Sequence, residues 1–325
     1  MKSSFDGLFC RKSLADTGII GDEPISSWTG PDMIFHTPVD NHQAFFKTDA
    51  SYDSDPNQRV QGDRDNTLYV RARKLGSGAE EGHFYAYATE ASLVLLPEHW
   101  RDNPVNDASG REGSRLPRTG SGQVVVGEEP LLFRPSVSNT HYCLVGRIVT
   151  ASKPNPIPTV VAWEGLIRWA RESPNVCYRN LFLENNTGTS WSTLKRVANM
   201  ENRPRKGLLT VETGPKVLAG TKVWVTCPRL GLDVSWTIER GDPGRVVRVD
   251  LLPRFDDFLE VRAVSPGPWS RGASVMVEFH LSTIPEDNLA EYAVPAATLI
   301  ARGFEHVPDK QELIVQAGAI TVVLR

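Results

Sequence analysis

Acidic and amide side chains gather in one polar stretch of the chain, and these residue types hold hard metal ions. The stretch supplies seven of them within eighteen residues: Asp49, Asp53, Asp55, Asn57, Asp63, Asp65 and Asn66. Calcium takes roughly six to eight oxygen ligands from carboxylates and carbonyls. The spacing differs from that of an EF-hand, so a solvated loop of turn-forming residues is the alternative. The candidate calcium ligands are Asp49, Asp53, Asp55, Asp63 and Asp65, and calcium titration calorimetry is their test.

Three tyrosines form a second candidate site, on the predicted outer face of a sheet. Tyr69 lies in a segment, residues 66–75, whose apolar and polar side chains alternate; this is the pattern of a strand with one buried and one solvated face. Tyr85 and Tyr87 alternate in the same way with Phe84 and small alanines. Rows of aromatic residues suit contact with carbohydrate or protein, although ordinary cross-strand pairs produce them too. Tyr69, Tyr85 and Tyr87 are therefore candidate ligand-binding residues.

Signatures of catalysis are absent from the sequence. It lacks the nucleophile elbow G-x-S-x-G, the zinc-binding H-E-x-x-H and the phosphate-binding G-x-x-x-x-G-K. No two of the seven histidines lie four residues apart. Asp256 and Asp257, near Glu260, are neighbours that point apart in a strand or turn, which favours a solvated turn over an acid–base pair. We therefore expect no enzymatic activity, with a metal-dependent hydrolase as the alternative.

Three short motifs resemble recognition signals. Residues 116–120 spell the sortase signal L-P-x-T-G, but they lie far from the C-terminal position that such a signal needs. Residues 240–242 spell Arg-Gly-Asp, and the following Pro-Gly indicates a turn. Asn185 begins a glycosylation sequon, which matters only in a glycosylating compartment. We interpret the first two as chance matches made of turn-forming residues.

Composition excludes some classes of partner. The chain has 325 residues and a net charge of −3, so it lacks the positive charge that follows a phosphate backbone, and we expect no nucleic-acid binding. No apolar run approaches the ~20 residues of a membrane helix. The N-terminus lacks the apolar core of a secretory signal. The predicted location is therefore the cytoplasm, or the outside by a route that does not read such a signal.

The four cysteines do not form a framework. Cys10, Cys143, Cys177 and Cys227 contain no C-x-x-C pair and fit neither a zinc site nor a disulfide pattern. We interpret them as buried thiols that act as small apolar side chains. A bridge between Cys143 and Cys177, on predicted neighbouring strands, stays open because sequence alone cannot decide it.

The order of the predicted elements indicates an all-β protein of two tandem immunoglobulin-like antiparallel β-sandwiches. The first, residues 1–190, has an N-terminal extension, a long exposed loop at 100–122 and one helix at 159–172, which Thr159 caps. A polar junction at 185–207 follows. The second, residues 208–325, contains seven short β-like runs with a turn roughly every 8–15 residues. They are 208–212, 221–226, 233–239, 246–251, 258–264, 274–282 and 313–324.

Within these elements, two alternating strands make definite predictions about burial. At 66–75 the residues expected inside are Leu68, Val70 and Ala72, and those expected in solvent are Tyr69, Arg71 and Arg73. At 274–280 the residues expected inside are Val275, Val277 and Phe279, which leaves Met276, Glu278 and His280 outside. The helix at 159–172 carries an apolar stripe that either closes one end of a sandwich or binds a partner.

Several segments together resemble a bacterial family of immunoglobulin-like modules, adhesion-related and CARDB-like. They are residues 11–18 (RKSLADTG), 30–34 (GPDMI), 66–76 (NTLYVRARKLG), 141–144 (HYCL) and 176–180 (VCYRN). The resemblance covers roughly residues 11–183. Gly30 and Lys74 depart from the family, which usually has Ser and Asn there. The resemblance implies a β-sandwich for binding or spacing, and it implies no catalytic residues.

Together these observations lead to one expectation about function. The chain is expected to be a non-enzymatic binding or structural module, a component of a bacterial surface, toxin or injection-type assembly. Its partner is expected to be a protein, and no cofactor is expected apart from the candidate calcium. The alternatives are a calcium-dependent hydrolase and a lectin-like module that binds carbohydrate through its tyrosines.

Overall fold

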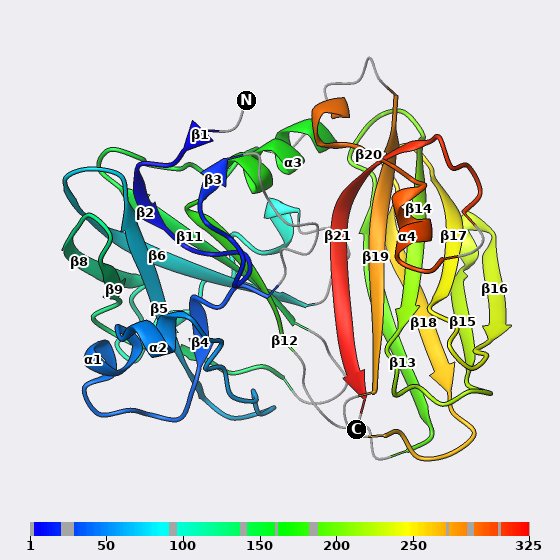
Figure 1. Cartoon of the computed structure of the whole chain (residues 1–325), viewed down its shortest axis with the longest axis horizontal. Coiled ribbons are helices and arrows are strands. Elements are labelled where there is room, and N and C mark those ends of the chain that lie inside the picture. Colours follow the sequence, from blue (N-terminus) through cyan, green and yellow to red (C-terminus); the bar gives the residue numbers. More distant parts are fainter. Residues whose placement is uncertain are drawn as a thin grey trace.

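Two antiparallel β-sandwiches lie side by side in the protein (Figure 1). The structure is a computed structural model, which describes residues 3–20, 29–90, 96–136, 142–159, 162–181, 188–270, 273–284, 289–304 and 307–324. Strands dominate, and the helices are few and mostly short. The predicted all-β fold of antiparallel sandwiches is therefore confirmed.

The first sandwich is built from residues 7–181. One sheet has the order β2-β5-β10-β7, with β4 and β9 also paired to β5, and the other has the order β12-β11-β6-β8. The strands of the first sheet are β2 (Gly7–Phe9), β4 (Met33–Phe35), β5 (Asn66–Leu75), β7 (Asn106–Asp107), β9 (Val124–Val126) and β10 (Leu131–Phe133). Those of the second are β6 (Ala79–Glu90), β8 (Ser114–Gly120), β11 (Tyr142–Thr150) and β12 (Val176–Leu181). A small sheet, β1 (Ser3–Ser4) with β3 (Ile19–Ile20), lies near the N-terminus.

The central strand β5 has the predicted core face but not the predicted solvated face. Leu68, Val70 and Ala72 are buried between the two sheets, as expected. Tyr69 and Arg71 are buried as well. Two short helices cover this outer face: α1 (His42–Phe46), whose Phe46 packs on Tyr69, and α2 (Asp49–Tyr52). These helices show no periodic pattern in the sequence because each is only about one turn long.

The predicted exposed loop at 100–122 is wrong over much of its length. Residues 114–120 form β8, which pairs with β6 from Ala79 to Phe84 with one register shift. Ser114 and Leu116 are buried. Pro117 and the flanking charges hid this strand from pattern reading, yet an edge strand with an irregular register tolerates a proline. The sortase-like motif therefore lies in a sheet.

The second sandwich is built from residues 190–324. Its sheets have the orders β13-β18-β15-β16 and β17-β14-β19-β21-β20. All seven predicted strands are present: β14 (Arg205–Thr213), β15 (Lys222–Cys227), β16 (Leu232–Thr237), β17 (Gly244–Leu251), β18 (Asp256–Val264), β19 (Ala273–Thr283) and β21 (Leu313–Leu324). Two more were not predicted, β13 (Ser190–Ala198) and β20 (Val294–Pro295). Because β13 pairs with β18 throughout, the second sandwich begins inside the predicted junction.

Strand β19 shows the same departure as β5. Val275, Val277 and Phe279 lie in the core as predicted, but Glu278 and His280 on the other face are also buried. The segment with η3 (Ala290–Tyr292), β20 and α4 (Thr298–Ala301) covers that face and packs Leu299 and Phe304 against the sheet. As in β5, the face predicted to be in solvent is buried, because a segment with no periodic pattern in its sequence packs over it.

The helix α3 (Trp163–Glu172) joins the two sandwiches rather than closing one of them. Trp163, Leu166 and Ile167 belong to the core of the second sandwich, and the Trp163 ring lies 6.0 Å from that of Phe279. On its other side, Trp169 stacks on Trp100 of the first sandwich at 6.0 Å. Figure 1 shows α3 at the top, between the two domains.

The start of helix α3 differs from the prediction. Its described part begins at Trp163, with Ala162 as the N-cap residue and no side-chain cap, so Thr159 does not cap it. Residues 160–161 lie outside the described residues, as do 91–95, 141 and the sequon at Asn185. In the described part of the chain no helix is long and apolar enough to cross a membrane.

Replacing Trp163 by Ala tests whether α3 packs in the core of the second sandwich. The side chain is fully buried, so we expect the free energy of unfolding to fall by about 3–5 kcal/mol in urea denaturation, mostly from the cavity left behind. The control is Leu194→Ala, whose side chain is 61% exposed and should change stability by less than about 0.5 kcal/mol. Equal small losses for both variants would contradict burial of α3 in the second core.

Candidate functional site

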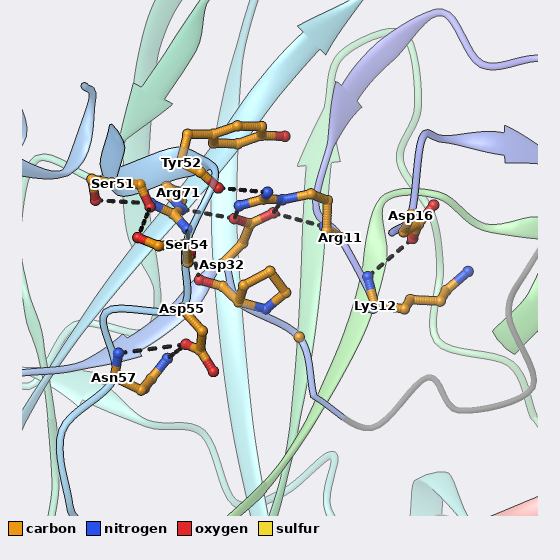
Figure 2. Close-up of polar contacts among 12 residues, drawn as sticks. Arg11, Lys12, Asp16, Asp32, Ser51, Tyr52, Ser54, Asp55, Asn57 and Arg71 are labelled. Carbon is orange, nitrogen blue, oxygen red and sulfur yellow. Dashed lines mark hydrogen bonds and ion pairs between the residues drawn. The ribbon is translucent and has the colours of Figure 1, made fainter. Parts of the chain in front are cut away.

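The most concentrated polar cluster in the first sandwich surrounds Asp32, and we call Arg11, Asp32, Tyr52 and Arg71 the Asp32 cluster (Figure 2). Arg11 donates through Nη2 to Asp32 Oδ1 at 2.6 Å and through Nε to Oδ2 at 3.1 Å. Arg71 Nε donates to Oδ1 at 2.7 Å. The Arg11 guanidinium lies 3.5 Å from the centre of the Tyr52 ring. Both arginines and the aspartate are buried.

Three separate segments position these groups. Arg11 follows β2, Asp32 precedes β4, and Arg71 lies in the middle of β5. The cluster holds two cations and one anion, and backbone carbonyl groups accept the remaining donors: Arg11 reaches Tyr52 O, while Arg71 reaches Ser51 O and Pro31 O. Burial raises the pKa of the Tyr52 phenol. The cluster therefore stabilises the fold around a neutral tyrosine.

The residues that carry the family resemblance have structural contacts here. Asp16 accepts hydrogen bonds from the backbone N–H groups of Lys12 and Gly18 at 3.0 Å each. Gly18 has a φ of 75°, a conformation that favours glycine. Arg11, Asp32 and Arg71 come from three of the matching segments and meet in the Asp32 cluster. These three segments therefore supply groups that hold the sandwich together, and membership of the CARDB-like family stays a prediction.

The five candidate calcium ligands are not gathered into one site. Asp49 lies in the first turn of α2, and Asp53 is its C-cap residue. Asp55 pairs with Arg179 at 2.7 Å, Asp63 has a φ of 54° in a turn, and Asp65 lies 4.0 Å from Arg134. Among the described residues no group of three or more His, Cys, Asp or Glu could hold a metal ion. Calcium binding stays a prediction without geometric support.

The three tyrosines do not form one row. Tyr69 is on β5 and buried, and its hydroxyl accepts the Val39 N–H at 2.9 Å. Tyr85 and Tyr87 are on β6, in the other sheet, where Arg147 lies over both rings. Tyr87 is buried, which leaves Tyr85 partly exposed. The prediction of a shared tyrosine face is wrong because 66–75 and 79–90 belong to opposite sheets.

The strand pairing keeps Cys143 and Cys177 apart, so the possible disulfide between them does not form. The two strands pair with Cys143 opposite Asn180 and Gly146 opposite Cys177. The two cysteines thus lie on opposite faces of the sheet, in different apolar clusters, and neither forms a disulfide. Their burial confirms the interpretation of small apolar side chains.

The remaining motifs lie in ordinary turns and strands. Gly241 of the Arg-Gly-Asp sequence has a φ of 81° in the predicted turn, and the Asp242 carboxylate accepts the Gly244 N–H at 2.8 Å. Asp256 pairs with Arg196, while Asp257 lies 3.6 Å from Arg229. The acidic pair is therefore divided between two arginines, as neighbours that point apart should be.

All four buried carboxylates of the described residues are paired with arginine. Asp32 pairs with Arg11 and Arg71; the other pairs are Asp107 with Arg111, Glu201 with Arg203 and Arg205, and Glu278 with Arg302. Sequence reasoning missed these pairs because the partners come from distant segments or from positions predicted to be solvated. Two of the pairs are four residues apart in the sequence, but neither lies in a helix, so this spacing was no signal.

Glu278 is the carboxylate whose surroundings most resemble an active site. Its Oε2 accepts from Arg302 Nη1 at 2.6 Å and from Thr210 Oγ1 at 3.1 Å, and Oε1 accepts from Gln316 at 2.7 Å. The Nε2 of His280 lies 3.5 Å away. Burial alone would raise the pKa of Glu278, but His280 and Arg302 outweigh it, so the pKa is lowered. An ionised, fully bonded carboxylate is a poor general acid.

Lys195 is an unusual buried group near the first sandwich. Its side chain is 1% exposed, and Nζ has no hydrogen-bond partner. Burial lowers the pKa of Lys195 to about 7, and Cys143 of the first sandwich opposes that change weakly. His99 lies at the same seam, where burial and the charge of Arg196 lower its pKa. Both groups thus have a lowered pKa where the two sandwiches meet.

Comparisons with known proteins find only distant likeness. No protein-family model and no curated protein matches the chain. Among solved structures, a red sea bream transglutaminase has 13% identity and a TM-score of 0.22, with 82% of this chain and 30% of that one covered. The calcium-binding domain CBD12 of CALX1.1 has 10% identity and a TM-score of 0.22, with 79% and 93% covered.

A third structure, the collagen-binding domain of the Erysipelothrix rhusiopathiae surface protein RspB, has 10% identity and a TM-score of 0.17, with 82% and 92% covered. The chain spans only 30% of the length of the transglutaminase. Likenesses at these TM-scores carry no argument about what this protein binds or does.

Replacing Asp32 by Asn tests the Asp32 cluster. The change leaves two buried guanidinium groups without a counter-charge, so the free energy of unfolding should fall by about 3–5 kcal/mol. The matched control is Asp55→Asn, which removes a partly exposed pair with Arg179 and should cost about 1 kcal/mol or less. Urea denaturation of both variants makes the comparison. Similar losses would show that the cluster does not hold the fold.

Replacing Lys195 by Met tests how this buried amine changes the free energy of unfolding with pH. The pKa of Lys195 is about 7 in the folded protein and about 10.4 in the unfolded chain. Between about pH 7 and pH 10.4 the unfolded chain binds more protons than the folded protein, so stability rises with pH. The buried lysine therefore destabilises the protein most at about pH 7 and below, and least above about pH 10. Met should therefore stabilise the protein at pH 7 by a few kcal/mol, and this advantage should shrink by pH 10. A difference that does not change with pH would refute the lowered pKa.

Proposed function

We propose that this chain is a non-enzymatic module whose two joined β-sandwiches present a fixed surface to a protein partner. The observation that carries the proposal is the pairing of all four buried carboxylates of the described residues with arginine. Charged groups with such partners hold segments of the fold together. They are not poised to exchange protons with a substrate.

The electrostatics supports this proposal. A general acid or base works best when its pKa is close to the operating pH, which for a carboxyl group means a raised pKa. Hydrogen bonds with Ser109, together with those of Arg111, lower the pKa of Asp107, and the pKa of Glu278 is lowered as well. Thr210 Oγ1, the hydroxyl that donates to Glu278, is itself fully buried.

The outer face of the sheet β13-β18-β15-β16 is the surface that best suits a protein partner. Leu194 and Phe258 are 61% and 51% exposed and lie diagonally on neighbouring strands, since Leu194 is opposite Glu260 and Arg196 opposite Phe258. Trp224 lies on the same face under Lys222 and Arg262. Exposed aromatic and arginine side chains around an apolar centre are typical of contact surfaces between proteins.

The resemblance to CARDB-like modules supports a place for this module in a bacterial surface, toxin or injection-type assembly. The joint through α3 supports it too, because a shared core fixes the angle between two sandwiches, as a structural component requires. The alternatives make different demands. A calcium-dependent hydrolase requires heat on calcium titration and turnover of substrate, and a lectin-like module requires retention on a glycan array through Tyr85.

The test combines enzyme assays with capture of a partner protein from the native host. Assays with ester, peptide, glycoside and phosphate substrates, with and without calcium, should show no turnover. Wild-type protein should capture a partner from the native host, and the double variant Leu194→Asp, Phe258→Asp should lose it. The control is Leu14→Asp on the first sandwich, a side chain that is 51% exposed and should leave capture unchanged. Turnover above background, or capture that survives the double variant, would contradict the proposal.

A further inference from the structure

Three of the four edges of the second sandwich are protected against pairing with another strand. Edge β13 faces the first sandwich and carries an inward-pointing charge, Lys195. Edge β17 carries Arg245, Arg248 and Asp250, and edge β20 has two residues, one of them Pro295. Charges, proline, very short strands and covering segments are the known means of blocking a free edge.

The fourth edge, β16, has fewer of these protections, and its one charged residue is Asp233. It runs for six residues, Leu232–Thr237, in unbroken register with β15. It contains no proline, no basic residue and no bulge, and every position is partly or fully exposed. In the described part of the chain, β16 pairs only with β15. Figure 1 shows it at the end of the molecule farthest from the first sandwich.

We propose that β16 pairs antiparallel with β16 of a second copy of this chain, so that two four-stranded sheets become one continuous eight-stranded sheet. The symmetry is two-fold and centred on Ser235, which places Val234 opposite Trp236 of the partner and Asp233 opposite Thr237. The inference is independent of the proposed function, because a non-enzymatic module needs no self-association.

The inner face of this pairing continues the apolar core. In each copy Val223 is opposite Trp236 and Val225 is opposite Val234. Both β15 residues are buried, and Trp236 packs against the same core while Val234 remains 36% exposed. The pairing would place four apolar side chains in a row across two copies, with the exposed Val234 next to a tryptophan. Pairs of aromatic and β-branched residues stabilise neighbouring strands.

The outer face supplies opposite charges in the same rows. Lys222 is opposite Thr237 in each copy, and the pairing places Asp233 of the second copy on the far side of that small threonine. The long Lys222 side chain lies over Trp224 on this face and can extend across Thr237 toward the carboxylate. Two-fold symmetry repeats the contact, so each dimer holds two such rows.

These charges select the register. Centring the pair on Val234 instead would place Asp233 opposite Ser235 and in the row of Trp224, away from Lys222. It would also bring Gly231, which has a φ of 63° at the end of η2 (Pro228–Leu230), into the paired region. A residue in that left-handed conformation does not continue a strand. Centring on Ser235 uses only extended residues.

The test is the mass of the full chain by sedimentation equilibrium over a series of concentrations. A single pair of edge strands is a small interface, so we expect a weak dimer whose fraction rises with concentration. Lys222→Glu and Asp233→Lys should each weaken association by about three- to tenfold. The double variant Lys222→Glu, Asp233→Lys exchanges the charges and should restore it. Restoration distinguishes this register from any other contact.

The second arm addresses the inner face. Val234→Lys should abolish the dimer, while Leu252→Lys, at a side chain that is 51% exposed elsewhere, should leave it intact; circular dichroism checks that both variants fold. Amides of residues 233–237 should exchange more slowly with deuterium as the concentration rises. A wild-type protein that stays monomeric throughout overturns the proposal. A dimer that Val234→Lys leaves intact, or that the double charge exchange fails to restore, overturns it too.

Discussion

The first sandwich depends on two arginines that share one buried aspartate. Arg11, Asp32 and Arg71 come from segments that are distant in the sequence, and their guanidinium and carboxylate groups can satisfy one another only when those segments have the native arrangement. An incorrect register would leave at least one charge buried without a partner, which is costly in a low-dielectric interior. The cluster therefore contributes to the choice of one fold as much as to its stability. Tyr52 and the carbonyl groups of α2 complete it, which is why a short, weakly helical segment stays in place over β5.

The strands of the second sandwich could mostly be predicted from the sequence. Its seven predicted strands alternate between apolar and polar residues and are separated by Gly and Pro turns, so local pattern and tertiary pairing agree. β13 was missed because it lies in a polar, Ser- and Thr-containing stretch, and one of its inward residues is Lys195. In β5 and β19 the inner faces were right and the outer faces wrong. Periodicity states which side chains point the same way, but it does not state what another segment will place on top of them.

The candidate sites could be predicted less well, for a related reason. Sequence proximity grouped five aspartates into one site, whereas the fold assigns them to a helix, a cap, an ion pair and a turn. Tyr69 and Tyr85 are close in the sequence but occupy opposite sheets. The clusters that do exist join distant residues: Asp32 with Arg71, Glu278 with Arg302, and Lys195 beside Cys143. Only tertiary structure reveals such pairs, because neither partner carries a local signature.

The helix α3 has a consequence for how this polypeptide reaches its native state. It lies in the chain between β11 and β12, the last two strands of the first sandwich, yet it buries Trp163 in the second hydrophobic core. A ribosome would therefore release the helix before the core that covers it has been synthesised, with its apolar stripe exposed in the meantime. We therefore expect the two sandwiches to unfold as one cooperative unit despite their separate sheets, and a cut at residue 190 would separate α3 from the core that covers it.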